Sequence, residues 1–144
     1  MRWVAKLGSQ TYGNPTVANG RVYVGTNNDV PRDPRFKGDR SCVYCLEEKT
    51  GELIWQLNVP KLGTGKVSDW EFLGICSSPA IEGDRAYLMT NRCEVMCVDV
   101  LGMSCTSMSF VLGSQHVWAA LSEAQSAARL QARMLCSNQL EHGA

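Results

Sequence analysis

Short runs with two alternating kinds of side chain recur between residues 15 and 100. Val22 and Val24 alternate with Tyr23, and the same period returns in residues 86–88. A period of two is typical of a β-strand whose two faces meet different surroundings. Gly, Asn and Asp separate these runs and favour tight turns. The pattern predicts an all-β fold class, with short strands joined by hairpins.

A constant offset shows that these runs belong to a repeat. Residues 15–27 match residues 79–91 at an offset of 64, and Pro, Arg, Tyr, Thr and Asn recur in register. Residues 43–47 match residues 95–99 at an offset of 52, so the first copy carries 12 extra residues. These fall at residues 29–40, a charged segment with two prolines that cannot form a continuous strand. We expect a surface loop there.

Each copy supplies the strands of one small sheet. Two short strands flank an Asn-Gly or Gly-Asp turn, and a third follows at residues 42–46 and 94–98. The first copy adds a fourth strand at residues 52–57, and Trp3 precedes Trp55 by the same 52 residues. Four antiparallel strands in a unit of about 50 residues are typical of a β-propeller blade. We therefore predict a partial β-propeller of about two four-stranded antiparallel blades.

One motif connects this repeat with a known family. Residues 45–55 read Cys-Leu-Glu-Glu-Lys-Thr-Gly-Glu-Leu-Ile-Trp. They resemble the tryptophan-docking motif A-x-D-x-x-T-G-x-x-x-W of the pyrroloquinoline quinone-like β-propeller repeat family, which includes quinoprotein alcohol dehydrogenases. Thr50, Gly51 and Trp55 match, whereas a cysteine replaces the alanine and a glutamate replaces the aspartate. The resemblance implies a structural, blade-docking role for these three residues, with the indole packed between neighbouring blades.

The end of the chain departs from the repeat. The resemblance covers residues 1–101, and no Thr-Gly-x-x-x-Trp follows Asp99. We therefore assign residues 1–101 to the partial propeller and residues 102–144 to a non-propeller tail. Apolar residues at helical spacing predict a helix at residues 114–136 in that tail.

Charge and hydropathy narrow the possible partners. The 14 basic and 14 acidic side chains cancel, so no net field draws the chain to nucleic acid. No run approaches the roughly 20 apolar residues that cross a bilayer, so we expect no membrane insertion. The amino terminus lacks the apolar core of a secretory signal. The resembling family is typically periplasmic or otherwise exported, so the localisation stays unassigned.

Cysteine and histidine offer little chemistry in the repeat. Both histidines, His116 and His142, lie in the tail, which leaves the repeat without an imidazole for a nucleophile pair or a zinc site. Cys42 and Cys45 form a C-x-x-C, but positions three apart on a strand point to opposite faces. The chain has seven cysteines, an odd number, so buried reduced thiols are the expected state.

Two other segments contain residues of the kinds found in phosphate and calcium sites. Residues 63–66, Gly-Thr-Gly-Lys, lack the Ser or Thr that would contact magnesium in a phosphate loop, which favours a linker between blades. Asp29, Asp33 and Asp39 of the insertion could hold calcium, but four cations lie among them and favour a self-neutralised surface. We therefore predict no catalytic, cofactor-binding or metal-binding residue.

Two functions fit these observations. The first is a non-catalytic binding or assembly scaffold, as in the propeller lipoprotein of the outer-membrane barrel assembly machinery, which shares the repeat. The alternative is a remnant of a quinoprotein dehydrogenase, inactive as two blades because the family holds pyrroloquinoline quinone (PQQ) and calcium with residues from several blades. We expect no cofactor, and a protein partner or missing blades as partners. Open sheet edges also favour self-association, or a chain without independent function.

Overall fold

The computed structural model describes residues 2–63, 70–92, 94–102 and 105–109. In this part of the chain, eight strands form two four-stranded antiparallel sheets. Blade 1 contains β1 (Thr16–Ala18), β2 (Arg21–Asn27), β3 (Arg40–Glu47) and β4 (Leu53–Pro60). Blade 2 contains β5 (Ala80–Glu82), β6 (Arg85–Met89), β7 (Glu94–Asp99) and β8 (Cys105–Ser109). The helix predicted for residues 114–136 lies outside the described residues.

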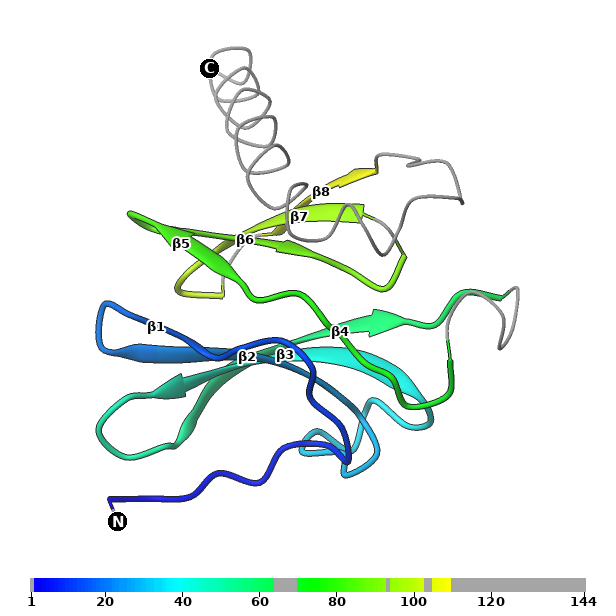
Figure 1. Ribbon diagram of the computed structural model, residues 1–144, viewed down its shortest axis with the longest axis horizontal. Coiled ribbons are helices and arrows are strands. Elements are labelled where there is room, and N and C mark those ends of the chain that lie inside the picture. Colours follow the sequence, from blue (N-terminus) through cyan, green and yellow to red (C-terminus); the bar gives the residue numbers. More distant parts are fainter. Residues whose placement is uncertain (1, 64–69, 93, 103–104, 110–144) are drawn as a thin grey trace.

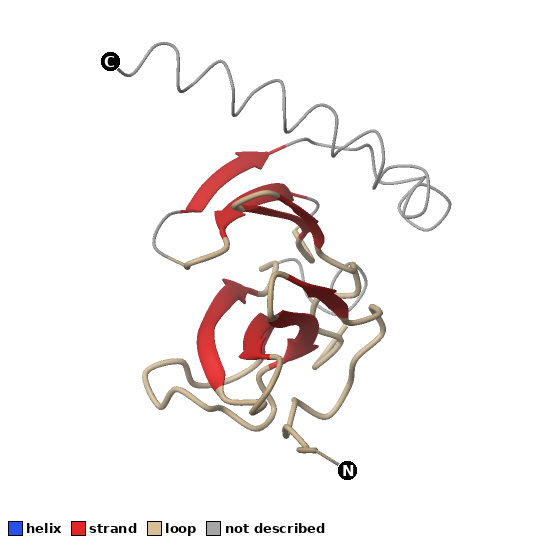
Figure 2. Cartoon of the chain, turned by 90° about the vertical axis from the view of Figure 1, so that its left-hand side faces the viewer, coloured by secondary structure: helices blue, strands red, loops and turns tan. Residues whose placement is uncertain are grey.

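Each blade is a simple meander in which every strand pairs with the next one along the chain. Figure 1 shows blade 2 stacked above blade 1, with the N-terminal segment beneath blade 1, and Figure 2 shows the same stacking from the side. The predicted all-β class and the pair of four-stranded blades are confirmed. The hairpin turns are also as expected, because Asn19, Gly20 and Gly83 all have positive φ values of 53°, 74° and 56°. Within the described ranges, no helix is long and apolar enough to cross a membrane.

The second sheet continues past residue 101, where the sequence analysis ended the repeat. β8 pairs with β7 from Val98 opposite Cys105 to Glu94 opposite Ser109. Gly102, with a φ of 76°, turns the chain back toward β7, and its N–H donates to the carbonyl of Asp99 at 2.8 Å. Pairing of this kind uses backbone groups and a glycine turn, so it does not require the Thr-Gly-x-x-x-Trp motif. The five residues of β8 therefore belong with the sheet and not with the tail.

The main core lies between the two blades. Blade 1 contributes Val43, Cys45 and Tyr23 from one face of β2 and β3, and blade 2 contributes residues of β6 and β7. Alternation along the strands explains the choice, because successive side chains point to opposite faces. The members of blade 2 in this core are Ala86, Leu88, Met96 and Val98. This packing fixes the blades face to face.

The innermost strands add polar links between the blades. Thr16 Oγ1 donates to the carbonyl of Pro79 at 2.6 Å, and the backbone N–H of Asn14 donates to Ser78 Oγ at 2.9 Å. Asn19 Nδ2 reaches the carbonyl of Gly83 at 3.2 Å, so the two hairpin turns also touch. The matched segments of the repeat thus lie side by side.

Candidate functional site

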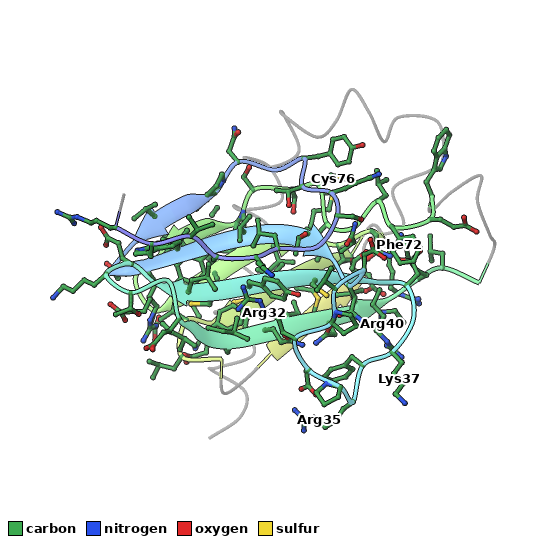
Figure 3. The ribbon with its side chains drawn as sticks, turned by 90° about the horizontal axis from the view of Figure 1, so that it is seen from below. Arg32, Arg35, Lys37, Arg40, Phe72 and Cys76 are labelled. Atoms are coloured by element: carbon green, nitrogen blue, oxygen red, sulfur yellow. The ribbon has the colours of Figure 1, made fainter. Side chains whose placement is uncertain are left out.

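The insertion of the first copy forms a long loop at one end of blade 1. It connects β2 to β3 and carries Arg32, Arg35 and Lys37, with Arg40 at the start of β3. Figure 3 shows these four cations on one side of the blade, where Arg35 and Lys37 extend away from the strands. Loops on a rigid sheet are frequent binding surfaces. We call this surface, residues 28–40, the cationic rim.

Two buried asparagines give the rim its shape. Asn28 is 1% exposed, and its Nδ2 donates to the carbonyls of Phe36 at 2.7 Å and Gly38 at 3.2 Å. Asn27 is fully buried, and its Oδ1 accepts from the N–H groups of Ser9 and Asp29 at 3.1 and 3.0 Å. Buried amides that satisfy backbone groups hold a loop in one conformation. One sign of this is visible in the sequence, since Asn27 is among the residues that recur in the repeat.

Asp39 ties the rim to a second segment of the chain. Its Oδ2 accepts the backbone N–H of Phe72 at 2.7 Å, and its Oδ1 lies 3.9 Å from Lys61 Nζ. The Nδ2 of Asn27 donates to the carbonyl of Phe72, so both backbone groups of that residue are held. Residues 70–76 therefore border the rim, as the label of Phe72 in Figure 3 shows. Sequence reasoning missed this contact because the two partners are 33 residues apart.

Most charged side chains of the rim contact a partner in the loop or on a neighbouring segment. Arg35 Nη2 lies 2.6 Å from Asp33 Oδ2, and its guanidinium holds the pKa of that carboxyl below its usual value. Arg32 lies 5.3 Å above the ring of Tyr44, and Arg35 and Arg40 each lie 5.7 Å from the ring of Phe36. Aromatic faces attract cations at such distances. These contacts agree with the self-neutralised surface that the sequence suggests.

The carboxylates of the insertion do not converge. Asp33 pairs with Arg35, whereas Asp39 faces Phe72 and Lys61. Within the described residues, no group of three or more His, Cys, Asp or Glu side chains could hold a metal ion. His116 and His142 lie outside those residues, as do residues 64–66 of the considered phosphate loop.

The three docking-motif residues have different partners in the structure. Trp55 lies between the blades, where its Nε1–H donates to the carbonyl of Val100 at 2.8 Å and its ring centroid is 6.0 Å from that of Tyr23. Gly51 has a φ of 75°, and a Cβ there would come within 2.4 Å of the Trp3 ring. Thr50 Oγ1 accepts the N–H of Glu52 at 3.2 Å and shapes the turn. The blade-docking role itself stays a prediction.

An equivalent turn in blade 2 was missed by the sequence analysis. Trp3 donates its Nε1–H to the carbonyl of Glu48 at 2.8 Å, as Trp55 does to Val100. A Cβ on Gly102 would come within 2.6 Å of the Trp55 ring, just as one on Gly51 would meet Trp3. Each indole therefore packs on the glycine turn of the following sheet. The sequence does contain a signal for the second turn: a glycine follows shortly after the acidic residue in both copies, Gly51 after Glu47 and Gly102 after Asp99.

The C-x-x-C cysteines are buried on opposite faces of β3. Cys42 packs with the cluster beneath blade 1, and Cys45 packs between the blades. Burial raises the pKa of Cys42 to about 12 and that of Cys45 to about 11. A thiolate is the form that attacks a disulfide or binds zinc, and these thiols stay protonated near neutral pH. The pair is therefore unsuited to redox or zinc chemistry.

Comparison with known proteins extends this description. A family model described as outer membrane protein assembly factor BamB matches residues 1–102. The matched segment includes Trp3 and both sheets up to the second glycine turn, at Gly102. A search of curated proteins finds no match.

Proposed function

The chain belongs to the PQQ-like repeat family of the outer membrane protein assembly factor BamB, and we propose that it is a non-catalytic scaffold that binds a protein partner. The family's description concerns the assembly of outer membrane proteins. For this chain we propose the same kind of task, in which two propeller blades present loops to a partner.

The observation that carries the proposal is the repeated indole contact. Trp3 and Trp55 each donate to a turn carbonyl of the following sheet at 2.8 Å, and a glycine in each turn leaves room for the ring. Half-buried aromatic rings with a satisfied N–H lock neighbouring elements together. A locked pair of blades is a rigid support for the loops at its end, which suits binding without requiring any reactive side chain.

We propose the cationic rim and its neighbouring segment as the binding surface. Trp70 is 67% exposed next to the segment that Asp39 holds, and Val30 on the rim is 55% exposed. Exposed tryptophan and arginine side chains are the residue types that dominate protein interfaces. Trp70 would be the apolar anchor, with Arg35 and Lys37 at its polar border.

The test measures binding of the chain to soluble domains of the outer-membrane protein assembly machinery by calorimetry. We expect Trp70→Ala to weaken binding about 30-fold, the effect of losing a typical hot-spot residue. Val17→Ala is the matched control, because Val17 is 58% exposed on β1, away from the rim. Both variants should keep the unfolding temperature of the parent chain. Absence of binding to every domain, or equal loss with both variants, would contradict the proposal.

The alternative function is a remnant of one of the family's quinoprotein dehydrogenases. No cluster of His, Cys, Asp or Glu suited to a metal ion is found among the described residues. An assay with added PQQ and calcium, followed by dye reduction with alcohols, separates the two functions. We expect no turnover, and any turnover would favour the dehydrogenase.

A further inference from the structure

Tyr44 and Gln56 form a cross-strand pair on the outer face of blade 1, the face turned away from blade 2. Tyr44 in β3 lies directly opposite Gln56 in β4. Trp55 and Leu57, the neighbours of Gln56, pack between the blades, so Gln56 points to the outer face. Tyr44 packs in the cluster on that face and is fully buried. Side chains in such positions have Cβ atoms about 5 Å apart and share their surroundings.

Three polar atoms of this pair are buried without a protein partner. They are the hydroxyl oxygen of Tyr44 and both amide atoms of Gln56, Oε1 and Nε2, and within the described residues none of them has a hydrogen-bond partner. Exchanging the two ends of the amide changes nothing, since both ends lack a partner. Nearly all buried polar groups in native proteins bond either to protein or to ordered water. We therefore expect a partner from outside the polypeptide.

The next pair along the same face is satisfied directly. Cys42 and Asn58 are also opposite each other, and the thiol of Cys42 donates to Asn58 Oδ1 at 3.1 Å. The two side chains are short and similar in length, so their polar atoms meet. The hydroxyl of a tyrosine lies farther from its backbone than the amide of a glutamine does. A bridging molecule can span that difference between Tyr44 and Gln56.

The chemistry of these atoms selects a small neutral molecule. A hydroxyl and a primary amide each donate and accept, whereas a bound anion needs donors and a bound cation needs acceptors. Arg32 lies 5.3 Å above the ring of Tyr44, but its guanidinium donates to the carbonyl of Lys6. Burial raises the pKa of Tyr44, so the hydroxyl keeps its proton near neutral pH. Water both donates and accepts, and it is the smallest molecule that does so.

We propose that a buried, ordered water molecule bridges the hydroxyl of Tyr44 and the side-chain amide of Gln56. This water fixes the ring over which Arg32 of the cationic rim lies. Arg32 in turn holds the N-terminal segment through the carbonyl of Lys6. The bound water thus helps to join the rim to the sheet of blade 1. This site goes beyond the proposed function, because it supports the rim whatever binds there.

Removal of the hydroxyl gives opposite results with and without the water. Tyr44→Phe keeps the ring that Arg32 covers. If water pairs the hydroxyl, the variant loses a hydrogen bond, and the equilibrium constant for unfolding should rise about fivefold. If the hydroxyl is unpaired, the variant removes a desolvation penalty, and the constant should fall. Urea unfolding measures the constant, and an unchanged or lowered value would overturn the proposal.

Tyr12→Phe is the matched control for that experiment. Tyr12 is 63% exposed, so its hydroxyl pays no burial penalty and competes with solvent for its bonds. The equilibrium constant for unfolding should be the same as in the parent chain. An equal rise in both variants would mean that the change at Tyr44 does not report a buried partner, and the proposal would fail.

Transfer of magnetisation from water tests the site in the parent chain itself, whether or not a variant folds. The side-chain amide hydrogens of Gln56 in the ¹⁵N-labelled chain should show a nuclear Overhauser effect to water with the sign of a long-lived, bound molecule. The rotating-frame experiment separates this transfer from hydrogen exchange. The effect should be lost in Tyr44→Phe, because the water then keeps only one of its two partners. Absence of the effect in the parent chain, or a direct bond between Tyr44 and Gln56 in a crystal structure, would overturn the proposal.

Discussion

Blade 1 and blade 2 each contain a glycine turn that receives an indole, but the two turns differ in their residues and in their span. In blade 1, Gly51 follows Thr50 and donates to the carbonyl of Glu47 at 2.8 Å, and in blade 2 Gly102 follows a leucine and donates to Asp99 at the same distance. Their φ values are 75° and 76°. Each turn receives an indole from earlier in the chain, Trp3 at Gly51 and Trp55 at Gly102. The glycine is thus the shared requirement, whereas the threonine is not.

The two blades differ in what lies on their outer faces. Beneath blade 1, the Trp3 segment covers Val24, Tyr44 and Leu46. Blade 2 instead presents Tyr87 and its neighbours on the side away from blade 1. If each tryptophan docks one sheet on the next, its contribution to stability should depend on how many apolar clusters it joins.

Removal of the indoles gives the largest expected effect. Trp55 packs against two core clusters between the blades, and Trp3 packs against one. We expect Trp55→Ala to cost about 3 kcal/mol of unfolding free energy and Trp3→Ala about 1–2 kcal/mol, since both rings are partly buried but Trp55 loses packing in two clusters. Urea unfolding of both variants measures the difference. Equal costs would contradict the expectation that the cost of losing a tryptophan follows the number of apolar clusters it joins.

The glycine turns give the next effect. Gly51→Ala must adopt a positive φ and also meet the Trp3 ring, so we expect a loss of about 2–3 kcal/mol. Gly20→Ala is the matched control, because its φ is 74° and a Cβ there would meet nothing within 4 Å. It should cost about 1 kcal/mol from backbone strain alone. Thermal or urea unfolding compares the two variants. If Gly20→Ala cost as much as Gly51→Ala, contact with the Trp3 ring would not add to the cost at Gly51.

The sequence predicted the blades better than it predicted the contacts of the motif. Alternation and the offset of 52 can both be read directly from the sequence. They predicted both sheets, the positive-φ turns and the insertion loop. That Gly51 packs on Trp3 could not be read from the motif, because Trp3 lies far from the motif in the sequence. β8 was missed because backbone pairing leaves no side-chain signature. Among the rim contacts, the bond of Asp39 to Phe72 joins distant segments whose approach depends on the whole fold.

The free energy of unfolding should depend on Asp39 of the rim more than on Asp33. Asp39→Asn replaces a carboxylate that accepts the Phe72 N–H and faces Lys61, and we expect it to cost about 1–2 kcal/mol. Asp33→Asn removes a surface ion pair with Arg35 and should leave stability unchanged within error. Chemical unfolding measures both, and the reverse order would contradict the tie between the rim and residues 70–76.

The smallest expected effect concerns the buried thiols of blade 1. Burial raises the pKa of Cys42 from 9.0 to about 12, so the folded state keeps a proton that the unfolded state loses. Its contribution to stability is complete below pH 9 and is lost as the pH rises toward 12. We expect the free energy of unfolding to fall less between pH 8 and 10 in Cys42→Ala, by no more than about 1 kcal/mol. Identical slopes in the two proteins would contradict the raised pKa.

The most direct test of docked successive blades is a double-mutant cycle between Trp55→Ala and Gly102→Ala. A methyl at Gly102 would crowd the Trp55 ring, with a Cβ within 2.6 Å, so its cost should shrink once the ring is gone. We expect the two changes to be non-additive by at least about 1 kcal/mol in the free energy of unfolding. Additivity within about 0.5 kcal/mol would mean that the indole of blade 1 does not pack on the turn of blade 2.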